Sequence, residues 1–216
     1  MSGPALDYQS DVSYGAGMAS MATPYELFGR REEPARDLAR QASAVASACH
    51  AMAVRFHRGG KLIVFGTGGA SADAQHVAVE FVHPVIVGKR ALPAIALTAD
   101  VATITGIAER DGFGQVFARQ LRALARPDDI AMGISPDGNS PSVLAGLAAA
   151  RELGLLTVAL TGGGSGGAIV ASPAVDHTLA AASDDPRVVK EMHVTMYHVL
   201  WELVHVFFEQ PGVLAS

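Results

Sequence analysis

The segment LIVFGTGGAS at positions 62–71 decides the fold of this chain. It opens with an unbroken apolar run, which is typical of a parallel strand buried on both faces. Glycines follow at once, and then a helical pattern over 70–82. At such a junction glycines let backbone N–H groups approach an anion, and the helix N-terminus favours negative charge. The same glycines would also serve a tight turn without any ligand.

More short apolar runs follow along the chain, each separated from the next by a helical segment. The predicted strands are 62–65, 94–98, 130–134, 157–160 and 176–180, with helices at 70–82, 101–124, 140–152 and 166–171 between them. Strands that alternate with helices form a parallel sheet covered on both faces. We therefore expect an α/β fold, a three-layer αβα sandwich around a five-stranded parallel sheet. A helix from Pro34 to about Arg58 precedes the sheet, and one over 186–208 ends the fold.

Length and composition limit the classes of protein to consider. Residues 31–216 suit one domain, whereas residues 1–30 show no period and predict an irregular arm. A net charge of -5 argues against a nucleic-acid surface, and no apolar run is long enough for a membrane helix. The single cysteine, Cys49, lies in an Ala-rich helical run and cannot form an internal disulfide. We expect it to be a core residue of a cytoplasmic protein.

A second polar loop, SPDGNSP at 135–141, follows the third predicted strand. Ser140 or Asn139 can cap the next helix, and Pro-Asp-Gly is a turn signal, which together explain much of the loop without a ligand. However, the carboxyl ends of parallel strands meet at one edge of the sheet. This loop and the one at 66–71 therefore predict a phosphate cradle. The glycine-rich segment 161–167 predicts a flexible connector.

Two helices carry histidine and glutamate at helical spacing. His76 and Glu80 are four residues apart, so they lie on one face of the helix after the first loop. Beside an anion site such a pair can transfer protons or bind a metal, and elsewhere it would be a solvated surface pair. In the last helix, His198 and Glu202 also share a face. Spacing alone does not choose which polar residue of that helix enters a site.

Short motifs along most of the chain carry a resemblance to a known family. They are Gly66-Thr67-Gly68-Gly69, Asp73-Ala74-Gln75-His76 with Glu80, Leu92-Pro93-Ala94-Ile95-Ala96-Leu97-Thr98, Val116-Phe117-Ala118-Arg119-Gln120, Gly138-Asn139-Ser140-Pro141 and Glu191-Met192-His193. From about residue 35 to residue 208 the chain resembles the SIS-domain sugar isomerases, and among them the phosphoheptose (sedoheptulose 7-phosphate) isomerases. The resemblance implies a five-stranded parallel sheet and a homotetramer whose sites lie between subunits.

The resemblance also implies an activity, the aldose–ketose isomerisation of a sugar phosphate through an ene-diol. One group moves a proton between adjacent carbons, and another moves a proton between oxygens. By position, Glu80 matches the family's general base and His198 its partner acid/base, and in some members His76, Glu80 and His198 hold zinc. The positions that match substrate contacts are Thr67, Gly68, Gly69, Glu109, Arg110, Ser135, Asp137, Gly138, Asn139, Ser140 and Lys190.

Some of these positions depart from the family's pattern. Asp137 brings a negative charge to where phosphate should sit, and a like charge at about 4 Å costs on the order of 1 to 4 kcal/mol. Pro136 removes a backbone donor from the same loop. Lys190 replaces a glutamine that helps hold substrate and metal, so we expect that no cofactor is required and that zinc is disfavoured. Lys190 and Arg110 could instead offset Asp137 or grip an anion, which predicts an isomerase with an altered substrate.

Two other classes of function stay open. A non-catalytic SIS-domain protein binds a sugar phosphate or a protein partner, as DiaA-type members do. Asp137 and Lys190 favour that alternative, whereas His76, Glu80 and His198 oppose it. A metal-dependent lyase or hydrolase would use the same three residues, but Lys190 and the lack of a second carboxylate cluster argue against it.

Overall fold

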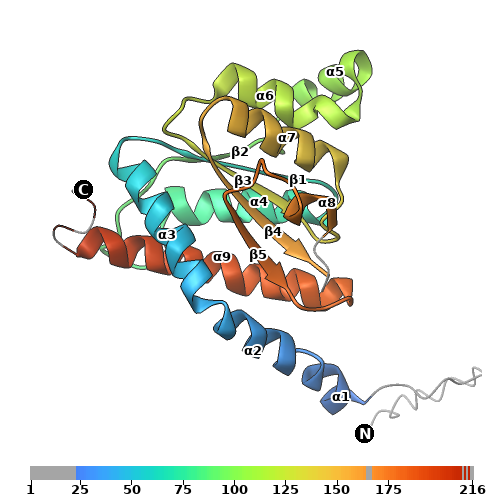
Figure 1. Cartoon of the computed structure of the whole chain (residues 1–216), viewed down its shortest axis with the longest axis vertical. Helices are drawn as coiled ribbons and strands as arrows, with labels where there is room; N and C mark the ends of the chain where they lie inside the picture. Colours follow the sequence, from blue (N-terminus) through green and yellow to red (C-terminus); the bar gives the residue numbers. More distant parts are fainter. Residues whose placement is uncertain (1–22, 164–166, 211, 213, 215–216) are drawn as a thin grey trace, which may run out of the picture.

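The structure, a computed structural model, describes residues 23–163, 167–210, 212 and 214 (Figure 1). One parallel sheet has the order β2-β1-β3-β4-β5. Its strands are β1 Leu62–Gly66, β2 Ala94–Ala96, β3 Ile130–Ser135, β4 Leu156–Gly162 and β5 His177–Ala181. The helices are α1 Pro24–Gly29, α2 Glu32–Arg40, α3 Ala42–His57, α4 Gly69–Val82, α5 Val101–Asp111, α6 Val116–Leu124, α7 Pro141–Glu152, α8 Gly167–Val170 and α9 Pro186–Glu209. The predicted α/β fold with a five-stranded parallel sheet is confirmed.

Two apolar layers cover the sheet, because each strand sends alternate side chains to opposite faces. In β1, Leu62 and Val64 pack with residues of α3, α4 and α9, whereas Ile63 and Phe65 pack with residues of α6 and α7. Figure 1 shows α5, α6 and α7 together on one side of the sheet, with α3 and α9 on the other. The polar face of each helix is thereby left for solvent or for a site.

The strand order positions the two polar loops side by side. The chain leaves β1 for one neighbour, β2, and then returns to the other side of β1 for β3. At such a switch point the connections from adjacent strands diverge and leave a crevice at their carboxyl ends, which is where open α/β sheets bind ligands. Gly66 is paired with Ile134, so the loops that follow β1 and β3 begin next to each other.

The cysteine prediction is confirmed, because Cys49 is fully buried in the layer between α3 and the sheet. Burial raises the pKa of its thiol to about 12, so it stays protonated and does not act as a nucleophile. None of the helices in the described part of the chain is long and apolar enough to cross a bilayer.

Two predicted helices are each divided in the structure. The helix expected over 34–58 breaks between α2 and α3 at Gln41, whose side-chain amide donates to the carbonyl of Ala180 on β5 at 2.8 Å. The helix expected over 101–124 ends at Gly112, whose φ of 87° only glycine adopts readily, and resumes after a 3₁₀ turn as α6. Helical periodicity continues through both breaks, so it could not reveal them.

The prediction of an irregular arm is wrong for residues 24–29, which form α1. Thr23 and Glu26 make a capping box, in which each side chain accepts a hydrogen bond from the other residue's backbone N–H. That short motif was the signal for a helix start. The remainder of the predicted arm, residues 1–22, lies outside the described residues.

The flexible connector predicted at 161–167 is wrong at both described ends. Thr161 and Gly162 belong to β4, and Gly167 begins α8. A Cβ atom at Gly162 would lie 2.4 Å from the carbonyl oxygen of Pro136, so that glycine allows close packing of β4 on the loop after β3. Residues 164–166 lie outside the described part of the chain.

Candidate functional site

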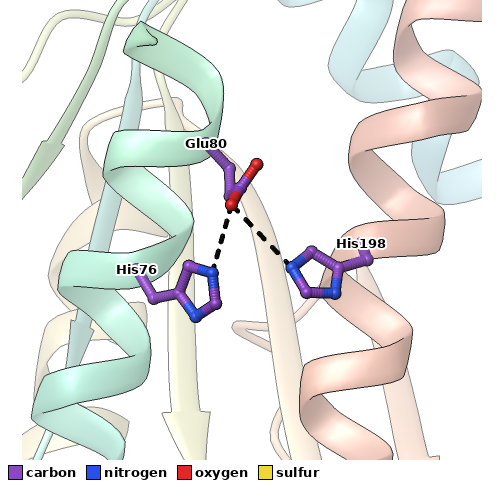
Figure 2. A group of neighbouring side chains, drawn as sticks. All are labelled: His76, Glu80 and His198. Carbon is purple, nitrogen blue, oxygen red and sulfur yellow. Dashed lines mark hydrogen bonds and ion pairs between the residues drawn. The ribbon is translucent and has the colours of Figure 1, made fainter. Parts of the chain in front are cut away.

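A carboxylate between two imidazoles forms the centre of the candidate site (Figure 2). His76 and Glu80 both come from α4, and Nε2 of His76 lies 3.1 Å from Oε1 of Glu80. His198 comes from α9, and its Nε2 lies 4.0 Å from the same oxygen. The side chain of Glu80 is 14% exposed, against 42% for His76 and 46% for His198. The structure therefore brings together one sheltered carboxylate and two titratable rings that solvent reaches.

Contacts between α4 and α9 fix the spacing of these three side chains. Tyr197, which is 1% exposed, has its hydroxyl 2.9 Å from Nδ1 of His76. Trp201 donates from its indole Nε1 to the backbone carbonyl of Glu80 at 2.9 Å. Burial and the nearby negative charges of Asp73 and Glu80 raise the pKa of Tyr197 to about 12, so its phenol stays neutral and keeps its proton.

A second polar group lies at the opposite end of the α4–α9 contact. Nζ of Lys190 donates to Oδ1 of Asp73 at 2.6 Å and to the carbonyl of Gly69 at 3.0 Å. Asp73 is buried, and its Oδ2 atom has no hydrogen-bond partner among the described residues. His193 is fully buried with Nε2 2.9 Å from the carbonyl of Thr161, and burial lowers its pKa. His193 is therefore a neutral core residue.

In the loop after β3, the hydrogen-bond donors bind the side chain of the loop's own Asp137. Oδ1 of Asp137 accepts hydrogen bonds from the Ser135 hydroxyl at 2.9 Å and from the Asn139 backbone N–H at 3.0 Å. The N–H of Ser140 in turn donates to the Ser135 hydroxyl at 3.2 Å. The Asn139 hydrogen bond, helped by the one from Ser135, lowers the pKa of Asp137 despite its partial burial. The hydroxyl of Ser135 and the N–H of Asn139, which would suit a phosphate, thus already bind the carboxylate of Asp137.

Asn139 and Ser140 only partly fulfil their predicted capping roles. Ser140 is the N-cap residue of α7, with Pro141 at the first helical position, but its side chain makes no capping hydrogen bond. Its hydroxyl lies instead 3.3 Å from that of Ser142. Oδ1 of Asn139 accepts from the N–H of Ala168 at 3.0 Å and so caps α8.

The glycine loop after β1 borders a hollow of about 190 Å³ at the N-terminus of α4. Gly68 is the N-cap residue with a φ of 57°, a conformation that a side chain would strain. Thr67, Gly68, Ser71 and Thr98 line this hollow, and the first turn of α4 begins at Gly69. A helix N-terminus favours an anion, so this loop fits the predicted cradle better than the loop after β3 does.

The substrate contacts predicted for Glu109 and Arg110 stay predictions. Arg110 pairs with the neighbouring Asp111, and no described hydrogen bond or ion pair joins Glu109 or Arg110 to the three central side chains. Lys190 pairs with Asp73, and no described contact joins it or Arg110 to Asp137, so the structure does not support the expectation that they offset Asp137. Each cation instead forms an ion pair with another acid, Lys190 with Asp73 and Arg110 with Asp111. That Lys190 and Arg110 grip an anion stays a prediction.

The donor set of the site fits a metal ion. The ligand atoms of His76, Glu80 and His198 lie within 4.8 Å of one another, and a His₂Glu set with an open position is a known zinc arrangement. The fourth position of the resemblance is Lys190, whose ammonium has no lone pair to give to a metal. Of the four ligand positions in the resemblance, the described residues therefore keep three, His76, Glu80 and His198.

Sequence reasoning missed the side chains that support the site. No motif or spacing in the sequence singles out Tyr197 or Trp201, and Asp73 enters only as part of a family motif. A buried Tyr or Trp normally finds a partner for its O–H or N–H, so the positions of Tyr197 directly before His198 and of Trp201 one turn after it were the available signal. Which partner each would meet depends on the α4–α9 crossing, which no local pattern specifies.

Comparisons with known proteins agree with the geometry. A model of the SIS domain family matches residues 33–162. A phosphoheptose isomerase of Solidesulfovibrio magneticus is 47% identical over 176 residues, or 81% of this chain and 84% of that protein. The solved phosphoheptose isomerase of Francisella tularensis has a TM-score of 0.78 at 34% identity, covering 84% of this chain and 96% of that one. The GmhA phosphoheptose isomerase of Neisseria gonorrhoeae has a TM-score of 0.76 at 30% identity, covering 83% and 95%.

Proposed function

The chain belongs to the SIS domain family and, within it, to the phosphoheptose isomerase-like proteins, and on that premise we propose that it is a sugar-phosphate isomerase. The reaction interconverts an aldose and a ketose through an ene-diol. One observation carries the proposal: a sheltered carboxylate oxygen of Glu80 lies 3.1 Å from one imidazole and 4.0 Å from another. Isomerisation needs a base for carbon and a shuttle for oxygen, and this group supplies both.

In this mechanism Glu80 takes the proton from the carbon next to the sugar carbonyl. The electron pair of the C–H bond forms the double bond of the ene-diol, and the carbonyl oxygen receives a proton. His198, with its exposed ring, gives and removes the protons at the two oxygens. Glu80 then returns its proton to the adjacent carbon, so the protein ends the cycle unchanged.

The substrate's phosphate would lie at the N-terminus of α4, against Thr67, Gly68 and Gly69. Ser135 and Ser140 close the opposite side of the crevice, since β1 and β3 are neighbours. Asp137 stands among these donors and repels an anion. We therefore propose a substrate that differs from that of the family members with an uncharged loop, either in the sugar or in the place of its phosphate.

We propose that the reaction requires no metal ion. Lys190 occupies the position of a metal ligand in the resemblance, and its charge repels a divalent cation. His76, Glu80 and His198 are the side chains that would hold zinc, which as a Lewis acid would polarise the sugar carbonyl. The proton transfers assigned to Glu80 and His198 need no such ion.

Assembly and compartment are further parts of the proposal. An apolar hollow of about 280 Å³ lies between α2, α3 and α9, lined by Leu38, Val45, Met196, Val199 and Leu203 among others. Helix faces of this kind pack into bundles, so we propose a homotetramer in which neighbouring subunits complete each site. The buried, protonated thiol of Cys49 suits the reducing cytoplasm.

An isomerisation assay tests the proposal directly. Full-length protein is incubated with five-, six- and seven-carbon sugar phosphates, sedoheptulose 7-phosphate included, and the products are followed by NMR in deuterated water. We expect turnover with deuterium incorporated at the carbon that exchanges its proton. Glu80→Gln should lower kcat by about 10²- to 10⁴-fold, since a positioned base contributes that much.

A matched variant controls for charge. Glu152→Gln removes an exposed carboxylate at the end of α7. This helix packs on the opposite face of the sheet from α4, so the change should leave kcat unchanged. Binding of a sugar phosphate without any turnover would overturn the isomerase and revive the non-catalytic alternative, which relatives that are isomerases do not favour. Activity that depends on stoichiometric zinc would instead revive a metal-dependent reaction.

A further inference from the structure

The ring of His76 is held at both nitrogens. Nδ1 lies 2.9 Å from the hydroxyl of Tyr197, and Nε2 lies 3.1 Å from Oε1 of Glu80. Tyr197 is 1% exposed and comes from α9, so it reaches His76 from the helix opposite. The rings of His76 and Tyr197 meet edge to face, with centroids 5.2 Å apart. A buried phenol, an imidazole and a carboxylate therefore form one continuous chain.

Counting protons along this chain leaves one arrangement that satisfies every group. An ionised carboxylate has only lone pairs, so Nε2 of His76 must carry the proton that faces Glu80. A neutral ring then has its lone pair on Nδ1, where the Tyr197 hydroxyl can donate. The opposite tautomer would point the Nε2 lone pair at the carboxylate. A charged imidazolium would donate to Tyr197 and leave the phenol proton without an acceptor among the described residues.

We propose that Tyr197 is a positioning residue, which holds His76 as the neutral tautomer with its proton on Nε2 and so directs that N–H at Glu80. The inference rests on the proposed function for its meaning, because Glu80 is the base of that reaction. Both contacts drawn in Figure 2 reach Oε1 of Glu80. No described side chain hydrogen-bonds to Oε2, which leaves that oxygen for the substrate's proton.

The same arrangement bears on metal binding, since a protonated Nε2 cannot coordinate a metal. If His76 bound zinc through Nε2, its proton would move to Nδ1, and Tyr197 would accept a hydrogen bond rather than donate one. Loss of such an accepting partner typically weakens metal binding by about 10- to 100-fold. In the metal-free protein the same hydroxyl donates to Nδ1 instead. The direction of one hydrogen bond therefore separates two roles for Tyr197.

The tautomer can be measured without any substrate. Full-length protein labelled with nitrogen-15 histidine is kept metal-free with a chelator at mildly alkaline pH, and His76→Gln assigns the signals of His76. We expect Nε2 to give the signal of a protonated nitrogen and Nδ1 that of an accepting one. In Tyr197→Phe, which keeps the packed ring, the two signals should move toward each other as the tautomers mix. Tyr25→Phe makes the same change at an exposed tyrosine of α1 and should leave both signals in place.

Kinetics complete the test. Tyr197→Phe should lower kcat by about 10-fold with little change in KM, because it acts through His76 rather than on the bound sugar. A proton found on Nδ1 in the wild-type protein, or a kcat unchanged in Tyr197→Phe, would overturn the proposal. Inactivity of the wild-type protein on every sugar phosphate would count against the proposed function alone, because the NMR result stands without turnover.

Discussion

The indole N–H of Trp201 on α9 donates a 2.9 Å hydrogen bond to the backbone carbonyl of Glu80 on α4. Glu80 lies in the last turn of α4, where carbonyls lack partners within the helix. The carbonyls beside it also have donors: Val79 accepts from the N–H of the C-cap residue His83, and Phe81 from that of Leu92 outside the helix. Trp201 thus satisfies a carbonyl at the C-terminal end of α4, and the same hydrogen bond holds the backbone of the proposed base in place.

We predict that Trp201→Phe destabilises the protein and slows it. The variant loses one hydrogen bond, leaves a carbonyl without its donor and shrinks a side chain that is 5% exposed. Together these should cost about 1 to 3 kcal/mol of unfolding free energy, measured by urea denaturation. Because α4 can then shift against α9, kcat should fall as well. Phe208→Leu, a change near the end of the same helix, should spare kcat, and an unchanged kcat in Trp201→Phe would contradict the positioning role.

A second prediction concerns the acid in the loop after β3. Asp137→Ser should tighten the binding of inorganic phosphate and of sugar phosphates by about 10-fold or more, because it removes a like charge from the donors of Ser135 and Asn139. Isothermal titration at two salt concentrations measures the gain, which should shrink at high salt. Asp128→Ser makes the same change in net charge at an exposed position before β3. It should change the affinity neither for inorganic phosphate nor for sugar phosphates. Equal gains in both variants would mean that only net charge matters.

The fold could be predicted from the sequence because each of its signals is local. An unbroken apolar run such as Leu62–Phe65 indicates a doubly buried strand, and alternation with helices then fixes a parallel sheet. Breaks were missed where a single side chain forms a long-range bond, as Gln41 does with Ala180 of β5. Such a bond depends on the sheet position, which periodicity does not contain.

The candidate site was predicted in part for the same reason. His76 and Glu80 share a helix, so their spacing alone brought them together, and the family resemblance added His198. Tyr197 could not be found in this way, because its partner lies 121 positions earlier on another helix. Lys190 was identified as a changed position, but its partner Asp73 depends on how α9 crosses α4.

A third prediction tests the role of that cation. Lys190→Gln should raise zinc affinity by about 10-fold, since it removes a positive charge from the α4–α9 contact and restores the glutamine that the family resemblance gives as a metal ligand. It should also leave buried Asp73 without its partner and cost about 1 to 3 kcal/mol of unfolding free energy. Zinc titration and urea denaturation measure the two effects. Arg187→Gln removes an exposed charge from the first turn of α9 and should not change zinc affinity. Unchanged zinc binding in Lys190→Gln would show that the three donors alone set the affinity.

The last prediction concerns stability at acid pH. Asp176 accepts hydrogen bonds from the N–H and hydroxyl of Thr157, each at 3.0 Å, and pairs with Arg151. Burial would raise the pKa of Asp176, but the bonds from Thr157 and Arg151 outweigh it and lower that pKa from its usual 3.8. A lowered folded-state pKa stabilises the protein above 3.8, and this contribution is lost as the pH falls below that value. Asp176→Asn should therefore cost about 1 to 3 kcal/mol at neutral pH, with the difference from wild type shrinking below pH 3.8. A difference that stays constant through that range in urea denaturation would mean that the charge of Asp176 contributes nothing and that only its shape matters.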